Sequence, residues 1–166
     1  LLSAYFFSDT GKFEFDLLYN ILQFPSLKFS KNDMSSRKET AQNWIFNQNH
    51  FFNDKDVFLK THNSLKEFDG YKFTSQKQTK GGIYIVRDPR NVITSIKNHY
   101  DLDDDKAIKW MTNKSNYIYD VEKVKQVGYG DFQFISSWDT NYKSWKVQDK
   151  IPVKFIKYED LTDQTY

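Results

Sequence analysis

The amino-acid sequence predicts an α/β protein in which helices flank a parallel sheet. Short apolar and aromatic runs at residues 57–59, 83–86 and 153–158 have the length and composition of strands. Segments with apolar residues at helical spacing separate these runs along the chain. Strands that alternate with helices favour a parallel sheet joined by right-handed crossovers.

Composition indicates a protein of one domain and argues against nucleic-acid-binding and membrane-spanning classes. The chain has 166 residues, enough for one domain over residues 1–166, and its 15 Phe, 11 Tyr and 4 Trp supply ample surface for a core. A net charge of +2 is too balanced for a nucleic-acid or membrane-surface protein. The absence of cysteine excludes disulfides, and no apolar run approaches the roughly 18 residues of a membrane span. We expect a cytoplasmic protein.

The first part of the chain is expected to be helical. Residues 1–8 have the character of the end of an apolar helix, which residues 8–11 break, so we expect the chain to be a fragment. Residues 14–24 return to helical spacing, and Pro25 ends that segment. The segment that follows, to about residue 32, is predicted to be irregular.

A second helical segment carries a clear start signal. Ser36 and Glu39 have the spacing of a capping box, in which each residue satisfies a backbone N–H of the other. A helix is therefore predicted from Ser36 towards Phe51, with Trp44 and Ile45 in the core.

The next strand is expected to lead into a candidate catalytic segment. Residues 53–56 have the composition of a turn, and residues 57–59 are predicted to form a short buried strand. This strand ends in Lys60-Thr61-His62. Residues 63–80 are polar and contain glycine, which predicts a loop beside the end of the strand.

The stretch from 82 to 100 predicts a strand, a tight turn and an amphipathic helix. Residues 83–86 suit a central strand of a parallel sheet, buried on both faces. Asp88 has the position of an N-cap, and Pro89 that of the first helical residue. The expected apolar face of the helix consists of Val92, Ile93, Ile96 and Tyr100.

This unit leaves Arg87 at the carboxyl end of the strand, with Ser95 two turns into the helix. Ligands of open α/β sheets bind at that edge, and an arginine beside a helix start suits an anion. One interpretation is therefore a phosphate site. The alternative is that Arg87 pairs with a carboxylate and Ser95 is a surface residue. Arg90 either contacts a phosphate or is simply exposed in the first turn of the helix.

The segments after this helix carry weaker signals. The acidic residues 101–105 lack the glycine and glutamate spacing of a calcium loop and are interpreted as the charged start of a helix through residues 107–111. Residues 117–128 are weakly periodic, and residues 128–130 are expected to form a loop.

The last helix and strand have clearer patterns. Residues 132–148 are predicted to form a long helix, followed by the strand over residues 153–158. Glu159 and Asp160 are expected to shape the turn that follows this strand. An aromatic stripe on the helix has the spacing of core contacts and consists of Phe134, Trp138, Tyr142 and Trp145.

His62 and Lys60 are the candidate catalytic residues. Residues two apart in an extended segment face the same side, so both side chains are expected at one edge. A neutral imidazole can take a proton from an attacking hydroxyl, and an ammonium can stabilise charge on a transferred group. The alternative is a structural or merely exposed histidine. His50 and His99 lie near predicted helix ends without metal-ligand spacing, so no metal is predicted.

Three segments resemble the sulfotransferases that use 3′-phosphoadenosine 5′-phosphosulfate (PAPS). VRDPRNVITSIKNHY resembles the family's 3′-phosphate segment, in which an arginine precedes a serine by eight residues, as Arg87 precedes Ser95. FLKTHNSL resembles the segment with the catalytic histidine, and VKFIKYEDL, after the helix segment SWDTNYKSW, resembles the strand whose tyrosine lies near the adenine. The matches run from about residue 57 to 161.

The resemblance implies a three-layer, P-loop NTPase-like sulfotransferase fold, present in part. It implies that His62 is the general base, that Lys60 contacts the sulfuryl group, and that Arg87, Ser95 and Tyr158 bind the nucleotide. For Tyr158, a core or rim position is the alternative. The implied reaction transfers a sulfuryl group from PAPS to a hydroxyl or amine of a small-molecule or glycan acceptor.

Two elements of that family are missing from the sequence: the N-terminal phosphosulfate-binding loop and a C-terminal glycine-rich basic segment. We therefore expect a domain truncated at both ends that is inactive as a fragment. Two other function classes are alternatives to sulfuryl transfer. A kinase of related architecture would need a magnesium carboxylate at a strand end, which the sequence does not clearly offer. A non-catalytic module would bind partners without nucleotide.

Overall fold

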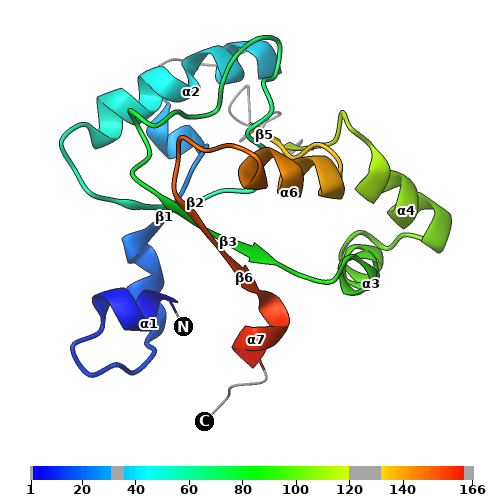
Figure 1. The fold of residues 1–166 in the computed structure, drawn as a ribbon, viewed down its shortest axis with the longest axis horizontal. Coiled ribbons are helices and arrows are strands. Elements are labelled where there is room, and N and C mark those ends of the chain that lie inside the picture. Colours follow the sequence, from blue (N-terminus) through cyan, green and yellow to red (C-terminus); the bar gives the residue numbers. More distant parts are fainter. Residues whose placement is uncertain (1, 31–35, 120–131, 163–166) are drawn as a thin grey trace. The chain divides into compact units, whose positions relative to one another are not determined.

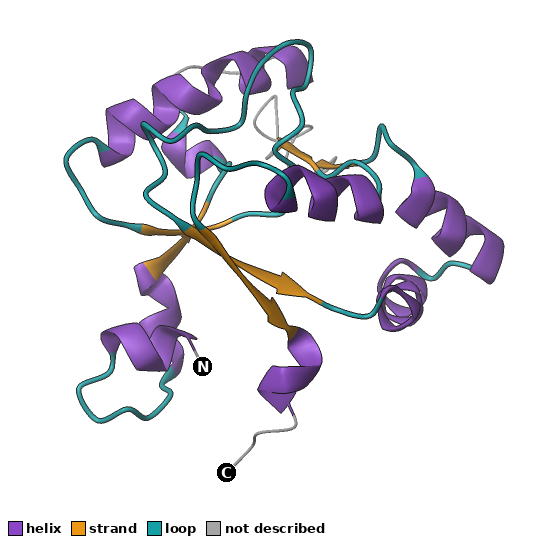
Figure 2. Cartoon of the chain, viewed as in Figure 1, coloured by secondary structure: helices purple, strands orange, loops and turns teal. Residues whose placement is uncertain are grey.

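The computed structural model describes residues 2–30, 36–119 and 132–162, and these form a mixed α/β structure (Figures 1 and 2). The described strands make three two-stranded sheets, which pair β1 with β2, β3 with β6, and β4 with β5. The chain divides into two compact units. The N-terminal unit contains residues 1–62 and 119–133, and the C-terminal unit contains residues 63–118 and 134–166.

The N-terminal unit is built on a short parallel strand pair. Ile21, Leu22 and Gln23 lie opposite Phe58, Leu59 and Lys60 in register. Its elements are α1 (Leu2–Phe7), the 3-10 helix η1 (Phe15–Asn20), β1 (Ile21–Gln23), the 3-10 helix η2 (Leu27–Phe29), α2 (Arg37–Phe52) and β2 (Phe58–Lys60).

Two predictions for this unit are wrong. Residues 21–23 form a strand rather than the end of a helix, because pairing with β2 satisfies their backbone groups and outweighs the local helical spacing. The strand around residue 58 is not buried, since both Val57 and Phe58 are more than a third exposed. Phe58 instead contacts the rings of Phe6 and Phe7 of α1, with ring centroids 4.7 and 5.2 Å away.

Helix α2 begins with the predicted capping box and contributes Trp44 to the core of the N-terminal unit. The Ser36 hydroxyl accepts from the Glu39 backbone N–H, and the Glu39 carboxylate accepts from the Ser36 N–H. Trp44 is 1% exposed and stacks on Phe132 of β5, with ring centroids 5.8 Å apart. Ile45 is half-buried, so Trp44 is the principal core contact of this helix.

The C-terminal unit is organised around β3 and β6, which pair in parallel. Gly82 to Val86 lie opposite Val153 to Lys157 in register. The elements of this unit are β3 (Gly82–Val86), α3 (Pro89–Tyr100), α4 (Asp104–Thr112), α6 (Trp138–Lys146), β6 (Val153–Lys157) and α7 (Tyr158–Thr162). The short strands β4 (Tyr117–Tyr119) and β5 (Phe132–Phe134) each contain residues of both units.

One face of the β3–β6 pair is covered by α6. The Tyr84 ring lies 5.3 Å from Phe155 and 6.0 Å from Tyr142, and the Tyr84 hydroxyl donates to Asn141 Oδ1 at 3.0 Å. Burial, followed by the neighbouring Tyr142 phenol, raises the pKa of Tyr84 to about 12. This phenol therefore stays protonated and keeps donating its hydrogen bond at physiological pH.

The opposite face of this strand pair is open. Ile83 is 42% exposed and Ile85 44%, so the prediction of a strand buried on both faces is wrong. Apolar composition alone does not distinguish a strand covered on two sides from one covered on a single side. The α/β class and the parallel pairing of β3 are confirmed. The three-layer arrangement, with helices on both sides of one parallel sheet, stays a prediction.

Helices α3 and α4 pack on each other through a small apolar cluster. Ile96, Ala107 and Met111 are buried at its centre, and the partly buried residues around them are Val92, Ile93, Leu102, Trp110 and Trp138. The predicted apolar face of α3 is confirmed for Val92, Ile93 and Ile96. Tyr100 at the end of that helix is 45% exposed.

The last third of the chain differs from the prediction mainly at the start of the predicted long helix. Residues 132–134 form β5, and α6 begins only at Trp138. Residues 117–119 form β4, whereas the weak periodicity and the loop expected over 120–130 lie outside the described residues. The turn expected after β6 is the short helix α7. No helix among the described residues is long and apolar enough to cross a membrane.

Candidate functional site

The candidate site in the C-terminal unit lies where β3 and β6 end at the same edge. The last paired residues are Val86 and Lys157, so Arg87 and Tyr158 follow side by side. The Arg87 guanidinium carbon lies 4.8 Å from the centroid of the Tyr158 ring, a cation–π contact. We call the residues Arg87, Asp88, Arg90, Tyr158 and Glu159 the strand-end corner.

Arg87 has hydrogen-bonding capacity that its surroundings do not use. Its Nε is buried and has no hydrogen-bond partner in the described part of the chain. A buried donor of this kind normally forms a hydrogen bond, since a buried donor without an acceptor costs about 1–3 kcal/mol. Such a donor on a guanidinium, which is always charged, suits an anionic ligand with several oxygens.

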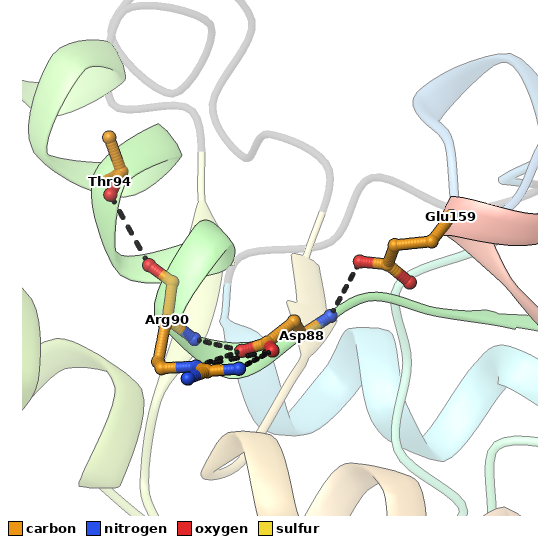
Figure 3. A network of polar contacts seen from close by, with 4 residues as sticks. All are labelled: Asp88, Arg90, Thr94 and Glu159. Carbon is orange, nitrogen blue, oxygen red and sulfur yellow. Dashed lines mark hydrogen bonds and ion pairs between the residues drawn. The ribbon is translucent and has the colours of Figure 1, made fainter. Parts of the chain in front are cut away.

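Asp88 is engaged with Arg90 instead (Figure 3). Its carboxylate accepts from the Arg90 backbone N–H at 2.9 Å, as the N-cap of α3. The Arg90 guanidinium donates to both oxygens, with Nε 3.0 Å from Oδ1 and Nη2 2.5 Å from Oδ2. The side-chain hydrogen bond from Arg90, with the backbone bond, lowers the pKa of Asp88 to about 2, and Asp88 raises the pKa of Arg90. The N-cap prediction is confirmed.

Glu159 joins the two strand ends. Its Oε1 accepts from the Asp88 backbone N–H at 3.2 Å (Figure 3). Hydrogen bonds from its own backbone N–H, first, and from that of Asp88 lower the pKa of Glu159. The sequence predicted only a turn here, so this contact was missed; it becomes visible once β3 and β6 are known to be adjacent.

Ser95 lies on α3 and is exposed. In the part of the chain that the structure describes, no hydrogen bond or ion pair links its side chain to the strand-end corner. The structure thus brings Arg87 and Tyr158 together but does not join Ser95 to them. Its role in phosphate binding stays a prediction.

Lys60 and His62 belong to the N-terminal unit. Lys60 is the last residue of β2, and His62 follows two residues later; Lys60 is exposed, and His62 is only partly exposed. The His62 backbone N–H donates to Gln133 Oε1 at 3.0 Å, and the Gln23 side-chain amide donates to the same oxygen at 3.2 Å. Gln133 is 5% exposed, so a buried amide fixes the backbone at His62.

Sequence reasoning missed Gln133 because residues 132–148 suggested one helix. The signal that was present is the alternation Phe132-Gln133-Phe134, which is also typical of a strand.

The surroundings of His62 favour its neutral form. Partial burial, first, and the positive charge of Lys60, second, lower the pKa of His62 below 6.5. At neutral pH the imidazole is therefore unprotonated and able to accept a proton.

Replacing Lys60 with methionine is expected to raise the pKa of His62, because a nearby positive charge that opposes imidazolium is removed. The pKa should still lie below 6.5, since burial is the larger cause. NMR titration of the His62 ring signals measures both values, with Lys55→Met on the turn before β2 as the control. A pKa of His62 that is the same in wild type and Lys60→Met would contradict this account.

The other histidines take part in aromatic contacts. His50 in the last turn of α2 stacks on Phe46, and His99 makes an edge contact with Tyr100. Among the described residues, no group of three or more His, Cys, Asp or Glu side chains could hold a metal ion.

Comparisons with known proteins returned nothing: no protein-family model, no curated protein and no solved structure matches this chain.

Proposed function

We propose that this chain is part of a PAPS-dependent sulfotransferase. The observation that carries the proposal is the contact between Arg87 and Tyr158 at the carboxyl ends of two parallel strands. These are two of the three residues that the sequence resemblance assigns to the nucleotide, and they come from segments about 70 residues apart. The parallel register places them side by side at the edge where α/β proteins bind ligands.

The charges at the strand-end corner support a phosphate ligand. Arg87 keeps a buried Nε without an acceptor, while the Asp88 carboxylate is bound by Arg90 and Glu159 accepts from a backbone N–H. Arg87 is therefore the positive charge of this corner without a carboxylate partner in the described chain. A 3′-phosphate, a dianion with three terminal oxygens, suits such a guanidinium.

Tyr158 supports a nucleotide over a free phosphate. Its ring contacts Arg87 yet remains 40% exposed. An exposed aromatic ring beside an anion site offers a surface against which a purine can pack. In this proposal the ring contacts the adenine while Arg87 holds the 3′-phosphate.

The proposed chemistry uses His62 and Lys60. His62 takes the proton of the acceptor hydroxyl or amine, whose oxygen or nitrogen forms a bond to the sulfur of PAPS. The bond from sulfur to the bridging phosphate oxygen breaks, and adenosine 3′,5′-bisphosphate leaves with that electron pair. Lys60 stabilises negative charge on the sulfuryl oxygens. A neutral His62 at physiological pH fits the role of base.

Nucleotide binding tests the proposal. We expect adenosine 3′,5′-bisphosphate to bind more tightly than 5′-AMP or ADP in calorimetry, and Arg87→Ala to weaken it about 10- to 100-fold, since a charged hydrogen-bonding group is lost. Binding of 5′-AMP should change little. Lys109→Ala, which removes an exposed charge from α4, is the matched control.

Equal affinity for the three nucleotides would overturn the proposal. Preference for ADP with magnesium would favour a kinase of related architecture instead.

A further inference from the structure

We propose that Arg90 is a positioning residue for the anion site: its guanidinium neutralises the Asp88 carboxylate, so that Arg87 can present its charge to the 3′-phosphate. The inference rests on the proposed function and assigns a role to a residue that its position in the sequence left open. In this account Arg90 acts through Asp88 and does not itself contact the nucleotide.

Arg90 forms hydrogen bonds with both oxygens of the Asp88 carboxylate. The guanidinium Nε lies 3.0 and 3.2 Å from the two carboxylate oxygens, and Nη2 lies 2.5 Å from Oδ2. The Arg90 backbone N–H adds a fourth bond, to Oδ1 at 2.9 Å. Both carboxylate oxygens are thus held on the side of the α3 first turn, as Figure 3 shows.

The Asp88 carboxylate lies next to the proposed phosphate site, so its charge affects the binding of an anion there. Asp88 follows Arg87 directly, and Glu159 is bound to the Asp88 N–H, so two carboxylates adjoin the proposed phosphate site. With Arg90 present, the corner has two positive and two negative side chains. Without Arg90, two carboxylates would oppose Arg87 alone, and a dianionic phosphate would meet net negative charge.

Two other roles are open to Arg90, and they predict different results. Arg90 could bind the phosphate directly, in which case no change at Asp88 would compensate for its loss. It could also contribute only to the start of α3, in which case nucleotide affinity would not depend on it.

A double-mutant cycle separates these roles. The affinity of the full chain for adenosine 3′,5′-bisphosphate is measured by calorimetry in wild type, Arg90→Ala, Asp88→Asn and the double variant. Asparagine keeps the N-cap, because its side-chain oxygen also accepts from a backbone N–H. Circular dichroism checks that each variant keeps its helices, and Arg90→Gln, which keeps the chain length without the charge, repeats the comparison.

We expect Arg90→Ala to weaken binding about 3- to 10-fold, the range for an exposed charge a few ångströms away. The double variant should return to within about twofold of wild type, since the unpaired carboxylate is gone. The affinity for 5′-AMP, which lacks the 3′-phosphate, should change much less in every variant. Unchanged binding in Arg90→Ala, or a double variant as weak as Arg90→Ala, would overturn the inference.

Helix α4 of the same unit supplies a matched control. Its N-cap Asp103 accepts from the Lys106 backbone N–H at 2.8 Å, and Lys106 Nζ lies 2.9 Å from Asp103 Oδ2. Lys106→Ala therefore removes an equivalent N-cap ion pair away from the strand-end corner, and we expect no change in nucleotide affinity. A wild-type protein without preference for the 3′-phosphate would overturn the proposed function itself, which is a different result from a failed rescue.

Discussion

Replacing His62 with alanine is expected to lower kcat for sulfuryl transfer by about 10²- to 10⁴-fold in any preparation of the protein that uses PAPS. The loss follows because the alanine side chain cannot take the proton of the acceptor. Affinity for adenosine 3′,5′-bisphosphate should stay within about twofold of wild type, since Arg87 and Tyr158 are intact. Initial rates and calorimetry measure the two quantities.

His99→Ala is the control for this prediction. His99 is exposed near the end of α3 and contacts Tyr100, and the proposal gives it no part in the reaction. Turnover by His99→Ala should therefore match wild type. Undiminished turnover by His62→Ala would remove the imidazole from the mechanism, whatever the nucleotide affinity.

Replacing Trp44 with alanine is expected to destabilise the N-terminal unit by about 3–5 kcal/mol, the usual cost of truncating a large buried aromatic side chain. Trp44 is 1% exposed and stacks on Phe132, so its removal leaves a cavity in the core of the unit. That cost is a large fraction of the stability of a typical domain. Urea unfolding followed by far-UV circular dichroism measures it.

Gln42→Ala on the same helix is the matched substitution. Gln42 is exposed, and alanine favours helix, so we expect a change within about 0.5 kcal/mol. A Trp44→Ala protein that unfolds at the same urea concentration as Gln42→Ala would show that this stacked pair is not the core of the unit.

Local signals in the sequence predicted local structure well. Ser36 and Glu39 mark the start of α2, and Asp88 with Pro89 marks the start of α3, because capping involves residues within one helical turn. The sequence therefore predicted where these helices begin.

Features that depend on distant segments were not predictable in this way. Ile21 and Leu22 fit a helical pattern, yet they pair with β2 more than 30 residues away. Ile83 and Ile85 fit a fully buried strand, yet one face of β3 is open. Hydrophobic spacing reports which residues can be buried, but the number of covering layers depends on the rest of the fold.

In the candidate site, too, the sequence indicated single residues but not the contacts between distant segments. Arg87 and Tyr158 were selected by their resemblance to a family, while their contact depends on the parallel register of β3 and β6. The carboxylate of Glu159 on the Asp88 N–H, and Gln133 on the His62 N–H, are also contacts between distant segments. No local pattern in the sequence predicts either contact.

The register of β3 and β6 also determines which genetic changes this region tolerates. Exchanging exposed Ile83 or Ile85 for another β-branched residue leaves the alignment of the two strands unchanged. Deleting or inserting a single codon within 82–87 would shift β3 against β6, turn Tyr84 away from α6 and carry Arg87 away from Tyr158. Over evolutionary time we expect these strands to accept substitutions while their lengths stay constant.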